Sequence, residues 1–126
     1  MQHLPLFADL KNRAVVVVGG GIVAERRVNL LLDAGAAVTV VAPTLTERLT
    51  ELETEGRFTH VARTYNGDSL EPFWLVIAAT DDRAVNAAVA AAALAAKRFC
   101  NVVDDLELCT FIMPAIVDRS PVTIAI

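Results

Sequence analysis

A run of four valines is followed directly by three glycines near the start of the chain, over Val15–Gly21. A continuous apolar run of stiff, β-branched residues indicates a strand buried on both faces of a parallel sheet. Glycine tolerates backbone conformations that other residues avoid, so the strand is expected to end in a tight turn. From Ile22 to Ala34 apolar side chains recur at helical spacing, and Gly35 follows where a helix C-cap belongs. The stretch therefore predicts a strand, a turn and a helix in immediate succession.

The same alternation of short apolar runs and helical patterns continues along the chain. Further strands are expected at Ala37–Ala42, Phe58–Ala62, Trp74–Ala79 and Phe99–Val103, with two more extended runs at Phe111–Val117 and Val122–Ile126. Helices are expected at Leu45–Glu55, with Thr44 as N-cap and Gly56 as stop, and at Arg83–Lys97, with a turn or short helix at Gly67–Pro72. Strands that alternate with helices indicate βαβ units. The predicted fold class is α/β, a Rossmann-like doubly wound parallel sheet.

Length and composition limit the classes of protein to which the chain can belong. Its 126 residues, of which 55% are hydrophobic, suit one compact domain. A net charge of −4 argues against a nucleic-acid partner, which normally meets a basic patch. Cys100 and Cys109 are too few for a disulfide framework. No stretch approaches the ~20 apolar residues of a membrane span or resembles a secretory signal, so we expect a cytoplasmic protein with no membrane partner.

Gly19–Ala24 fits the dinucleotide-binding pattern G-x-G-x-x-A. Gly19 would permit the tight turn, Gly21 would let the backbone approach a pyrophosphate, and Ala24 would let the helix pack closely on the sheet. The free amides at the helix start, including those of Ile22 and Val23, would face the phosphates, helped by the helix dipole. A glycine-rich turn without a ligand is the alternative. The flanking strand and helix favour dinucleotide binding.

The end of the second strand lacks the acid that many NAD-binding domains place there to hold the ribose hydroxyls. The chain has Ala42, Pro43 and Thr44 at this position, and no arginine that would accept a 2′-phosphate. Backbone groups at Ala42 and Pro43, or the hydroxyl of Thr44, are the remaining candidates to contact the ribose. The motif alone leaves the choice between NAD and NADP open.

Polar residues follow two later strands, in "AATDD" (Ala78–Asp82) and "NVVDD" (Asn101–Asp105). Ligands of open α/β sheets lie outside the carboxyl ends of the strands, so Thr80 and Asp81 are candidates to contact a cofactor. One of the two aspartates before the helix is expected to cap it. An acid at the end of the fifth strand suits a general base, although a solvated loop carboxylate is the alternative.

The remaining polar residues give no pattern of a metal site or a nucleophile. His3 and His60 are far apart and are each expected at the surface, so no metal site is predicted. The basic pairs Arg26–Arg27 and Lys97–Arg98 are expected on solvated faces.

Six stretches together resemble the N-terminal module of siroheme synthase, a precorrin-2 dehydrogenase and sirohydrochlorin ferrochelatase. They are "HLPLF" (His3–Phe7), "VVGGGIVAERR" (Val17–Arg27), "LLDAGA" (Leu31–Ala36), "AATDD" (Ala78–Asp82), "FCNVVDD" (Phe99–Asp105) and "FIMPAIVDRSP" (Phe111–Pro121). The resemblance covers essentially the whole chain. The combination "FCNVVD … FIMP" is far more specific than the glycine motif.

The resemblance implies an enzyme that uses NAD to oxidise precorrin-2 to sirohydrochlorin and then inserts Fe²⁺ to give siroheme. The family's catalytic carboxylate falls on Asp104 and is implicated in both reactions, although Asp105 beside it could be the acid that points inward. Substrate carboxylates would need cations, for which His3, Arg119 and Lys97 or Arg98 are candidates, either from the same chain or from the second subunit of a dimer.

The resemblance also implies a homodimer. Residues 1–112 would form the NAD-binding Rossmann domain and residues 113–126 the start of a dimerisation segment. The chain would then be a fragment of a longer protein that also carries a uroporphyrinogen-III methyltransferase domain.

Two other hypotheses compete with siroheme biosynthesis. One is a dinucleotide-sensing regulatory module of the potassium-transport type, which combines a similar glycine motif and strand end but usually has the acid that this second strand lacks. The other is a hydride-transfer enzyme for a small substrate, for which no separate substrate domain or catalytic His or Lys is visible.

Overall fold

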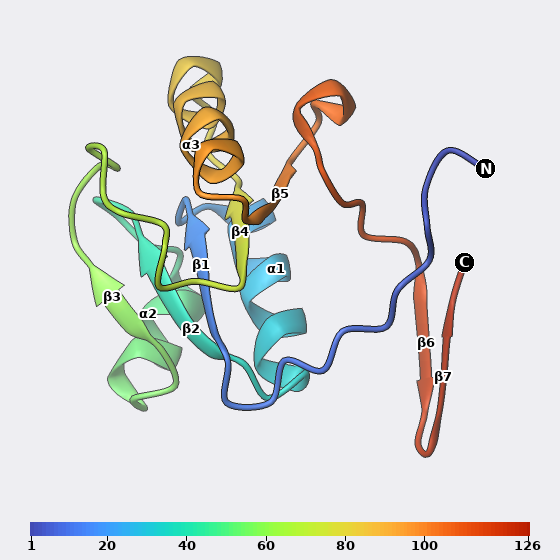
Figure 1. The fold of residues 1–126 in the computed structure, drawn as a ribbon. Coiled ribbons are helices and arrows are strands. Elements are labelled where there is room, and N and C mark those ends of the chain that lie inside the picture. The colour runs from blue at the N-terminus through green and yellow to red at the C-terminus, as the bar shows by residue number, and fades with distance from the viewer.

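A computed structural model describes residues 1–126 and places a five-stranded parallel sheet at the centre of the molecule (Figure 1). Its strands are β1 (Ala14–Val18), β2 (Ala37–Val41), β3 (Thr59–Val61), β4 (Leu75–Ala78) and β5 (Phe99–Val102). The helices are α1 (Ile22–Asp33), α2 (Glu47–Thr54) and α3 (Arg83–Ala95), followed by the 3-10 turn η1 (Leu106–Leu108). The strand order is β3-β2-β1-β4-β5. The predicted doubly wound sheet is confirmed.

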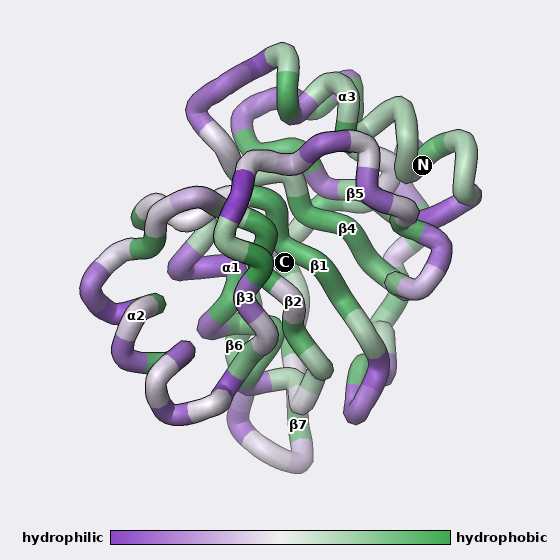
Figure 2. The backbone as a smooth tube through the Cα atoms, turned by 90° about the vertical axis from the view of Figure 1, so that its left-hand side faces the viewer, coloured by the Kyte–Doolittle hydropathy of each residue, from purple (hydrophilic) through white to green (hydrophobic).

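The valine run forms the central strand because both faces of β1 are covered. Val15 and Val17 pack in one apolar cluster with residues of α1 and α2, whereas Val16 and Val18 pack in a second cluster with residues of α3. These valines are at most 1% exposed. Figure 2 shows the resulting hydrophobic centre along β1 and β4. Burying each of these side chains stabilises the fold by about 1.5–3 kcal/mol. Because the valines alternate between the two clusters, β1 holds both helix layers against the sheet.

Helix α2 begins later than predicted. Thr46, and not Thr44, is its N-cap, and the Thr46 Oγ1 atom accepts a hydrogen bond from the Leu49 amide at 3.1 Å. Thr44 stays in the preceding turn because its carbonyl packs over Gly20 and because the Thr46 amide donates to the Gly20 carbonyl at 3.0 Å. The helix therefore starts where the chain leaves this contact.

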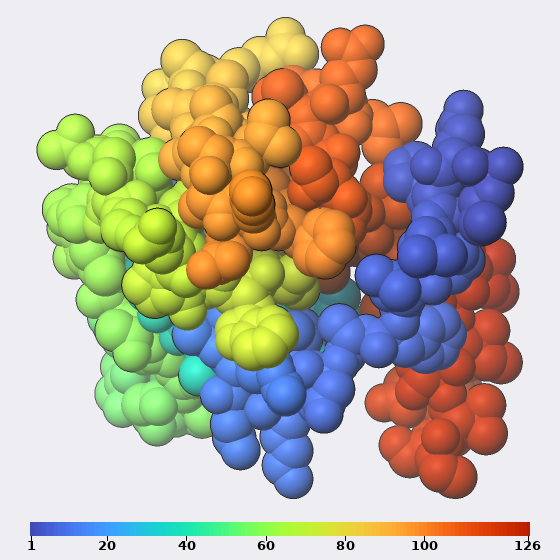
Figure 3. All heavy atoms as spheres, in the orientation of Figure 1, coloured from blue at the N-terminus to red at the C-terminus, as the bar shows by residue number.

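The last two extended runs do not join the parallel sheet. The run predicted from Phe111 becomes a strand only at β6 (Ile116–Arg119), which pairs antiparallel with β7 (Val122–Ala125). Every residue of this hairpin is exposed. The hairpin stands apart from the sheet and projects from the body of the molecule (Figures 1 and 3).

The segment Gly67–Pro72 is a loop with a turn and contains no helix. The other predicted strand and helix ends lie within two residues of the observed ones. None of the helices is both long enough and apolar enough to cross a bilayer.

All three helices end in the same hydrogen-bonding motif, in which the residue after the C-cap takes a left-handed conformation. These residues are Gly35 (φ +79°), Gly56 (φ +73°) and Lys97 (φ +58°). In each case its amide and the following amide donate back into the last turn, as in a Schellman motif. Glycine takes this conformation without strain, whereas Lys97 does not.

We expect Lys97→Gly to raise the free energy of unfolding by about 1 kcal/mol, because the left-handed conformation is costly for a residue with a Cβ atom. Gly56→Ala is the matched reverse change, since a Cβ atom there would meet nothing within 4 Å. It should cost about 1 kcal/mol from conformation alone. Urea unfolding of both variants checks the pair, and a Lys97→Gly variant no more stable than the parent would contradict the strain.

Candidate functional site

The register of the sheet brings four strand ends to one edge. Val18 of β1 pairs with Val41 of β2 and Ala78 of β4, and Ala78 pairs with Val102 of β5. The residues that follow these positions therefore gather at the carboxyl edge. A cleft of about 740 Å³ opens there.

The cleft is lined by residues from the turns after β1, β2, β3, β4 and β5. The lining residues are Val18, Gly19, Gly20, Gly21, Ile22, Val23, Val41, Ala42, Pro43, Thr44, Leu45, Thr46, Thr64, Tyr65, Ala79, Thr80, Asp81, Asp82, Val85, Val103 and Asp104. All of the residues predicted to bind the cofactor are among them, as is Asp104. Asp105 is not among them. One cleft thus joins the candidates from three separate motifs.

The three glycines of the motif differ in what surrounds them. A Cβ atom on Gly19, whose φ is +133°, would lie 2.3 Å from the Ala79 carbonyl oxygen. A Cβ atom on Gly20 would lie 2.0 Å from the Thr44 carbonyl oxygen. Gly21 has nothing within 4 Å of that position. Gly19 and Gly20 are therefore required by packing, whereas Gly21 leaves open space above the helix start.

Of the three α-helices, α1 alone has no side-chain cap on its first turn. The carboxylate of Asp82 caps α3 by accepting from the Ala84 amide at 2.9 Å, and Thr46 caps α2. Gly21 precedes α1 and offers no such acceptor. The amides of Ile22 and Val23 thus remain available to a ligand in the cleft, and an anion suits them best.

Thr80 is held in place by an asparagine that the sequence analysis did not single out. The Thr80 hydroxyl and amide donate to the Asn86 side-chain oxygen at 2.6 and 3.2 Å, and the Asn86 amide group donates to the Thr80 carbonyl at 3.0 Å. Asn86 is only 5% exposed. Its signal was available in the sequence, because it shares the buried face of α3 with Val89, Ala90 and Ala93.

The loop after β3 supplies a wall of the cleft that the sequence analysis also missed. Thr64 and Tyr65 line the cleft, and the Tyr65 hydroxyl donates to the Asp68 carbonyl at 3.1 Å. Arg63 forms a two-pronged ion pair with the Asp68 carboxylate, which also accepts from the Asn66 amide at 3.2 Å. The bonds from Arg63 lower the pKa of Asp68 from 3.8 to about 2.

His60 is not the surface histidine that was predicted, because its side chain is only 10% exposed. Its Nε2 atom lies 2.8 Å from the Ala42 carbonyl oxygen, and its Nδ1 atom lies 2.7 Å from a carboxylate oxygen of Glu53. A carbonyl oxygen only accepts, so Nε2 carries a hydrogen and donates it. His60 therefore ties the end of β2 to helix α2. His3 is exposed, as expected.

The cleft holds acids and no bases. Its charged lining residues are Asp81, Asp82 and Asp104, and no Lys, Arg or His lines it. Lys97 and Arg98 precede β5 and so lie at the opposite edge of the sheet, which argues against their proposed contact with a substrate in this cleft. The predicted cations His3 and Arg119 do not line it either.

The two arginines at the start of α1 differ. Arg26 is exposed, as predicted. Arg27 is half-buried, and its Nε atom is buried without a hydrogen-bond partner.

Asp104 and Asp105 differ in backbone and in exposure. Asp104 has φ +61°, is exposed and lines the cleft. Asp105 has φ −143°, is half-buried and begins the turn η1. The left-handed turn at Asp104 directs the chain out of β5 at the edge of the cleft. Of the two acids that the sequence left open, Asp104 is the one positioned at the cleft.

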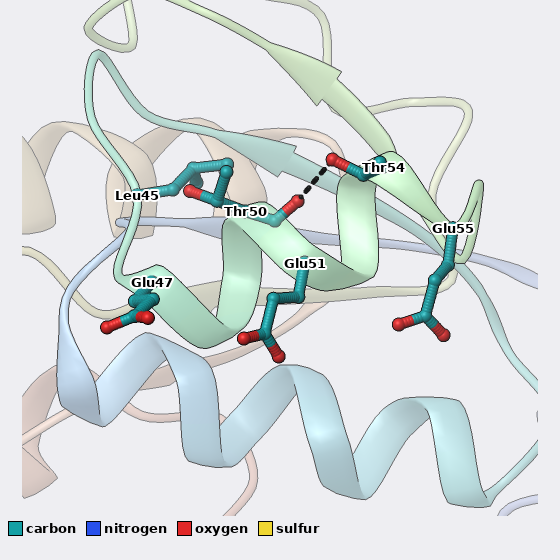
Figure 4. Close-up of a pocket in the computed structure, with 6 residues that line it drawn as sticks. All are labelled: Leu45, Glu47, Thr50, Glu51, Thr54 and Glu55. Atoms are coloured by element: carbon teal, nitrogen blue, oxygen red, sulfur yellow. Dashed lines mark hydrogen bonds between the residues drawn. The ribbon is translucent and has the colours of Figure 1, made fainter.

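A second hollow, of about 580 Å³, lies along α2 and is lined by Leu45, Glu47, Thr50, Glu51, Thr54 and Glu55. Figure 4 shows its three glutamates on one side of the helix. Their charge would repel a phosphate or a carboxylate. The cleft at the sheet edge is therefore the better site for an anionic ligand.

The chain is similar to a known family and to known proteins over most of its length. The family model described as "Putative NAD(P)-binding" matches residues 6–115. Siroheme synthase 1 of Yersinia enterocolitica is 54% identical over 126 residues, which are 100% of this chain and 27% of that protein. The siroheme synthase of Tolumonas auensis is 55% identical over the same share of this chain and 26% of its own. The chain thus spans about a quarter of the length of these curated relatives.

Two solved structures are similar as well. SirC, a precorrin-2 dehydrogenase, matches with a TM-score of 0.82 at 32% identity, over 98% of this chain and 61% of that one. GenD2 from gentamicin A biosynthesis, solved in complex with NAD, matches with a TM-score of 0.55 at 25% identity, over 79% of this chain and 29% of that one. The resemblance to siroheme synthase found in the sequence is borne out over the whole chain.

We expect Gly21→Ala to fold normally and to bind NAD⁺ roughly tenfold to a hundredfold more weakly. Its Cβ atom would occupy open space above the amides of α1, and losing charge-assisted hydrogen bonds costs about 1.5–3 kcal/mol. Gly20→Ala is the contrast, because its clash should cost about 3 kcal/mol of stability or more. Calorimetric titration and thermal unfolding separate the two effects. Unchanged NAD⁺ affinity in Gly21→Ala would exclude a pyrophosphate at this position.

We expect Asp68→Asn to destabilise the fold at neutral pH but not in strong acid. Since the pKa of Asp68 is about 2 in the folded protein against 3.8 ordinarily, its ionised form stabilises the fold above pH 3.8. That contribution should be lost as the pH falls through about 2. Urea unfolding of parent and variant between about pH 2 and pH 6 checks this. In an Arg63→Gln background the effect of Asp68→Asn on the free energy of unfolding should lose its pH dependence.

Proposed function

The chain belongs to this NAD(P)-binding family, and we propose that it oxidises precorrin-2 to sirohydrochlorin with NAD⁺ as the oxidant, a step of siroheme biosynthesis. The similarity to siroheme synthases and to SirC over nearly the whole chain supports the substrate. One observation carries the proposal. The uncapped start of α1 and the exposed carboxylate of Asp104 face the same cleft.

The residues of the cleft fit a dinucleotide. We propose that the amides of Ile22 and Val23 hold its pyrophosphate, with Gly19 and Gly21 shaping the turn below it. Packing around Gly19 and the open space beside Gly21 support this assignment. Ala42 and Pro43 would contact the ribose near β2, and Thr80 and Asp81 would contact the cofactor near β4, since all of these residues line the cleft.

NAD is preferred to NADP in this proposal. A 2′-phosphate would need a cation, and the cleft lining contains none. Backbone carbonyl groups at the end of β2 can accept hydrogen bonds from the ribose hydroxyls, so no acidic side chain is needed there.

We assign Asp104 as the catalytic base. When bound, NAD⁺ supplies the hydride acceptor for a two-electron oxidation, in which the macrocycle also loses a proton. The Asp104 carboxylate is exposed at the cleft, so it can accept that proton and pass it to solvent. Asp105 precedes η1 and does not line the cleft, so we assign it no role in the reaction.

Two further parts of the proposal come from the resemblance, and a third comes from the cysteine content of the chain. Asp104 would also take up pyrrole protons as Fe²⁺ enters sirohydrochlorin, because two protons must leave when the ion binds. Residues 113–126 would begin a dimerisation segment, which the exposed apolar side chains of the β6–β7 hairpin support. A cytoplasmic location agrees with the two free cysteines.

We expect Asp104→Asn to lower kcat for precorrin-2 oxidation by about a hundredfold or more, because it removes a proton acceptor. Asparagine also tolerates a positive φ, so the turn should persist. Absorbance measurements of NAD⁺-dependent turnover of freshly generated precorrin-2 check this. Asp105→Asn is the matched control and should keep most of the activity.

The other outcomes of this assay discriminate among the hypotheses. Equal turnover in parent and Asp104→Asn would remove Asp104 from the mechanism. NAD⁺ binding without turnover of precorrin-2 by the parent would favour a dinucleotide-sensing regulatory module of the potassium-transport type. Absence of NAD⁺ binding would contradict the whole proposal.

A further inference from the structure

The open edge of β5 is closed by two side chains and one backbone amide instead of a strand. β5 is the last strand of the sheet, so the backbone groups of Cys100 and Val102 that face outward have no neighbouring strand. Thr110 Oγ1 accepts a hydrogen bond from the Cys100 amide at 2.8 Å, and the Thr110 amide donates to the Cys100 carbonyl at 2.8 Å. Cys109 Sγ accepts from the Val102 amide at 3.1 Å. We call Cys109 and Thr110, with these bonds, the edge latch.

The edge latch encloses the turn that carries Asp104. Between Val102 and Cys109 the chain forms a compact loop, in which the Asp105 amide donates to the Val102 carbonyl at 3.3 Å and the Cys109 amide donates to the Leu106 carbonyl at 3.1 Å. The Cys109 thiol lies 3.3 Å from the Val102 carbonyl and 3.4 Å from the Asp105 carbonyl, so it can donate to either. The sulfur therefore contacts the backbone on both sides of Asp104.

The conformation of Asp104 needs such support. A non-glycine residue at φ +61° lies in a sparsely populated region. Such a conformation costs about 1–3 kcal/mol and persists only where the surrounding structure fixes it. The Asp104 side chain is exposed and forms no hydrogen bond or ion pair within the chain that would hold the turn. Its backbone is fixed by bonds of its neighbours. The Val103 amide donates to the Ala78 carbonyl of β4 at 3.0 Å, the Asp105 amide donates to the Val102 carbonyl, and the Cys109 thiol lies against the carbonyls of Val102 and Asp105.

We infer that Cys109 and Thr110 are positioning residues for Asp104, acting by holding the loop after β5 against the open edge of the sheet. The role rests on the proposed function, because the geometry of Asp104 matters for turnover only if Asp104 accepts the substrate proton. The latch itself is a separate claim about the backbone of Asp104. Each claim can be tested alone.

The first test is kinetic and uses conservative and non-conservative variants. We expect Cys109→Ala to lower kcat by roughly tenfold to a hundredfold, since a small displacement of a reacting group costs that much. The KM for NAD⁺ should change less than about twofold, because the residues proposed to hold the dinucleotide precede β5. Cys109→Ser keeps a donor and an acceptor and should recover most of kcat. Thr110→Val and Thr110→Ser form a second pair with the same expectation.

The second test is a double-mutant cycle with Asp104→Asn. If the latch acts through Asp104, Cys109→Ala should cause no further loss in that background. An equal loss in both backgrounds would overturn the positioning role. So would an unchanged kcat in variants whose latch is broken.

The third test needs no activity. The ¹³Cα shift of Asp104 reports its left-handed backbone, and amide hydrogen exchange of Val102 reports the bond to Cys109. We expect both to change in Cys109→Ala and to stay near the parent values in Cys109→Ser. A left-handed Asp104 that persists in Cys109→Ala and in Thr110→Val would overturn the inference, whether or not the parent turns over precorrin-2. An inactive parent with the expected shifts would overturn the proposed function and leave the latch established.

Discussion

The close contact between the Gly19–Gly20 backbone and the ends of β2 and β4 is the constraint on which the site depends. Gly19 fits against the Ala79 carbonyl and Gly20 against the Thr44 carbonyl, at distances that no Cβ atom could share. This contact turns the chain out of β1 at once and starts α1 beside the sheet edge. The first residues of α1 then line the cleft, and no side chain caps their amides. The helix start is therefore available to a ligand because the strand before it is packed so tightly.

The cleft can be acidic because backbone amides, and not basic side chains, are available to bind a dinucleotide. A dinucleotide held by amides needs no basic side chain, and the lining contains none, so the acids Asp81, Asp82 and Asp104 can share the space. A substrate with many carboxylates is a different case, because these acids would repel it. Its binding needs cations that the cleft does not contain. Arg119 lies on the exposed β6–β7 hairpin, and a second subunit that places such a hairpin over the cleft would meet this need.

Much of the fold and part of the site could be predicted from the sequence, because both depend on local patterns. A strand buried on both faces has a continuous apolar sequence, and a tight strand-to-helix turn has glycine at the turn. Asn86 left a signal in the helical spacing of α3, whereas the other missed features depend on individual side-chain contacts. His60 is buried because Ala42 and Glu53 meet it from other elements, and Tyr65 reaches the cleft because Asp68 folds its loop. No residue spacing in the sequence predicts these contacts.

The choice between Asp104 and Asp105 depends on backbone conformation and not on a sequence pattern. The two acids are adjacent and chemically identical, so composition and spacing cannot separate them. The backbone separates them, because Asp104 turns left-handed at the cleft while Asp105 enters η1. Aspartate carries a carboxylate and also tolerates this left-handed conformation. The strand that carries this turn, β5, is the last strand of the sheet. The open edge then has to be satisfied by other groups, and Cys109 and Thr110 supply them.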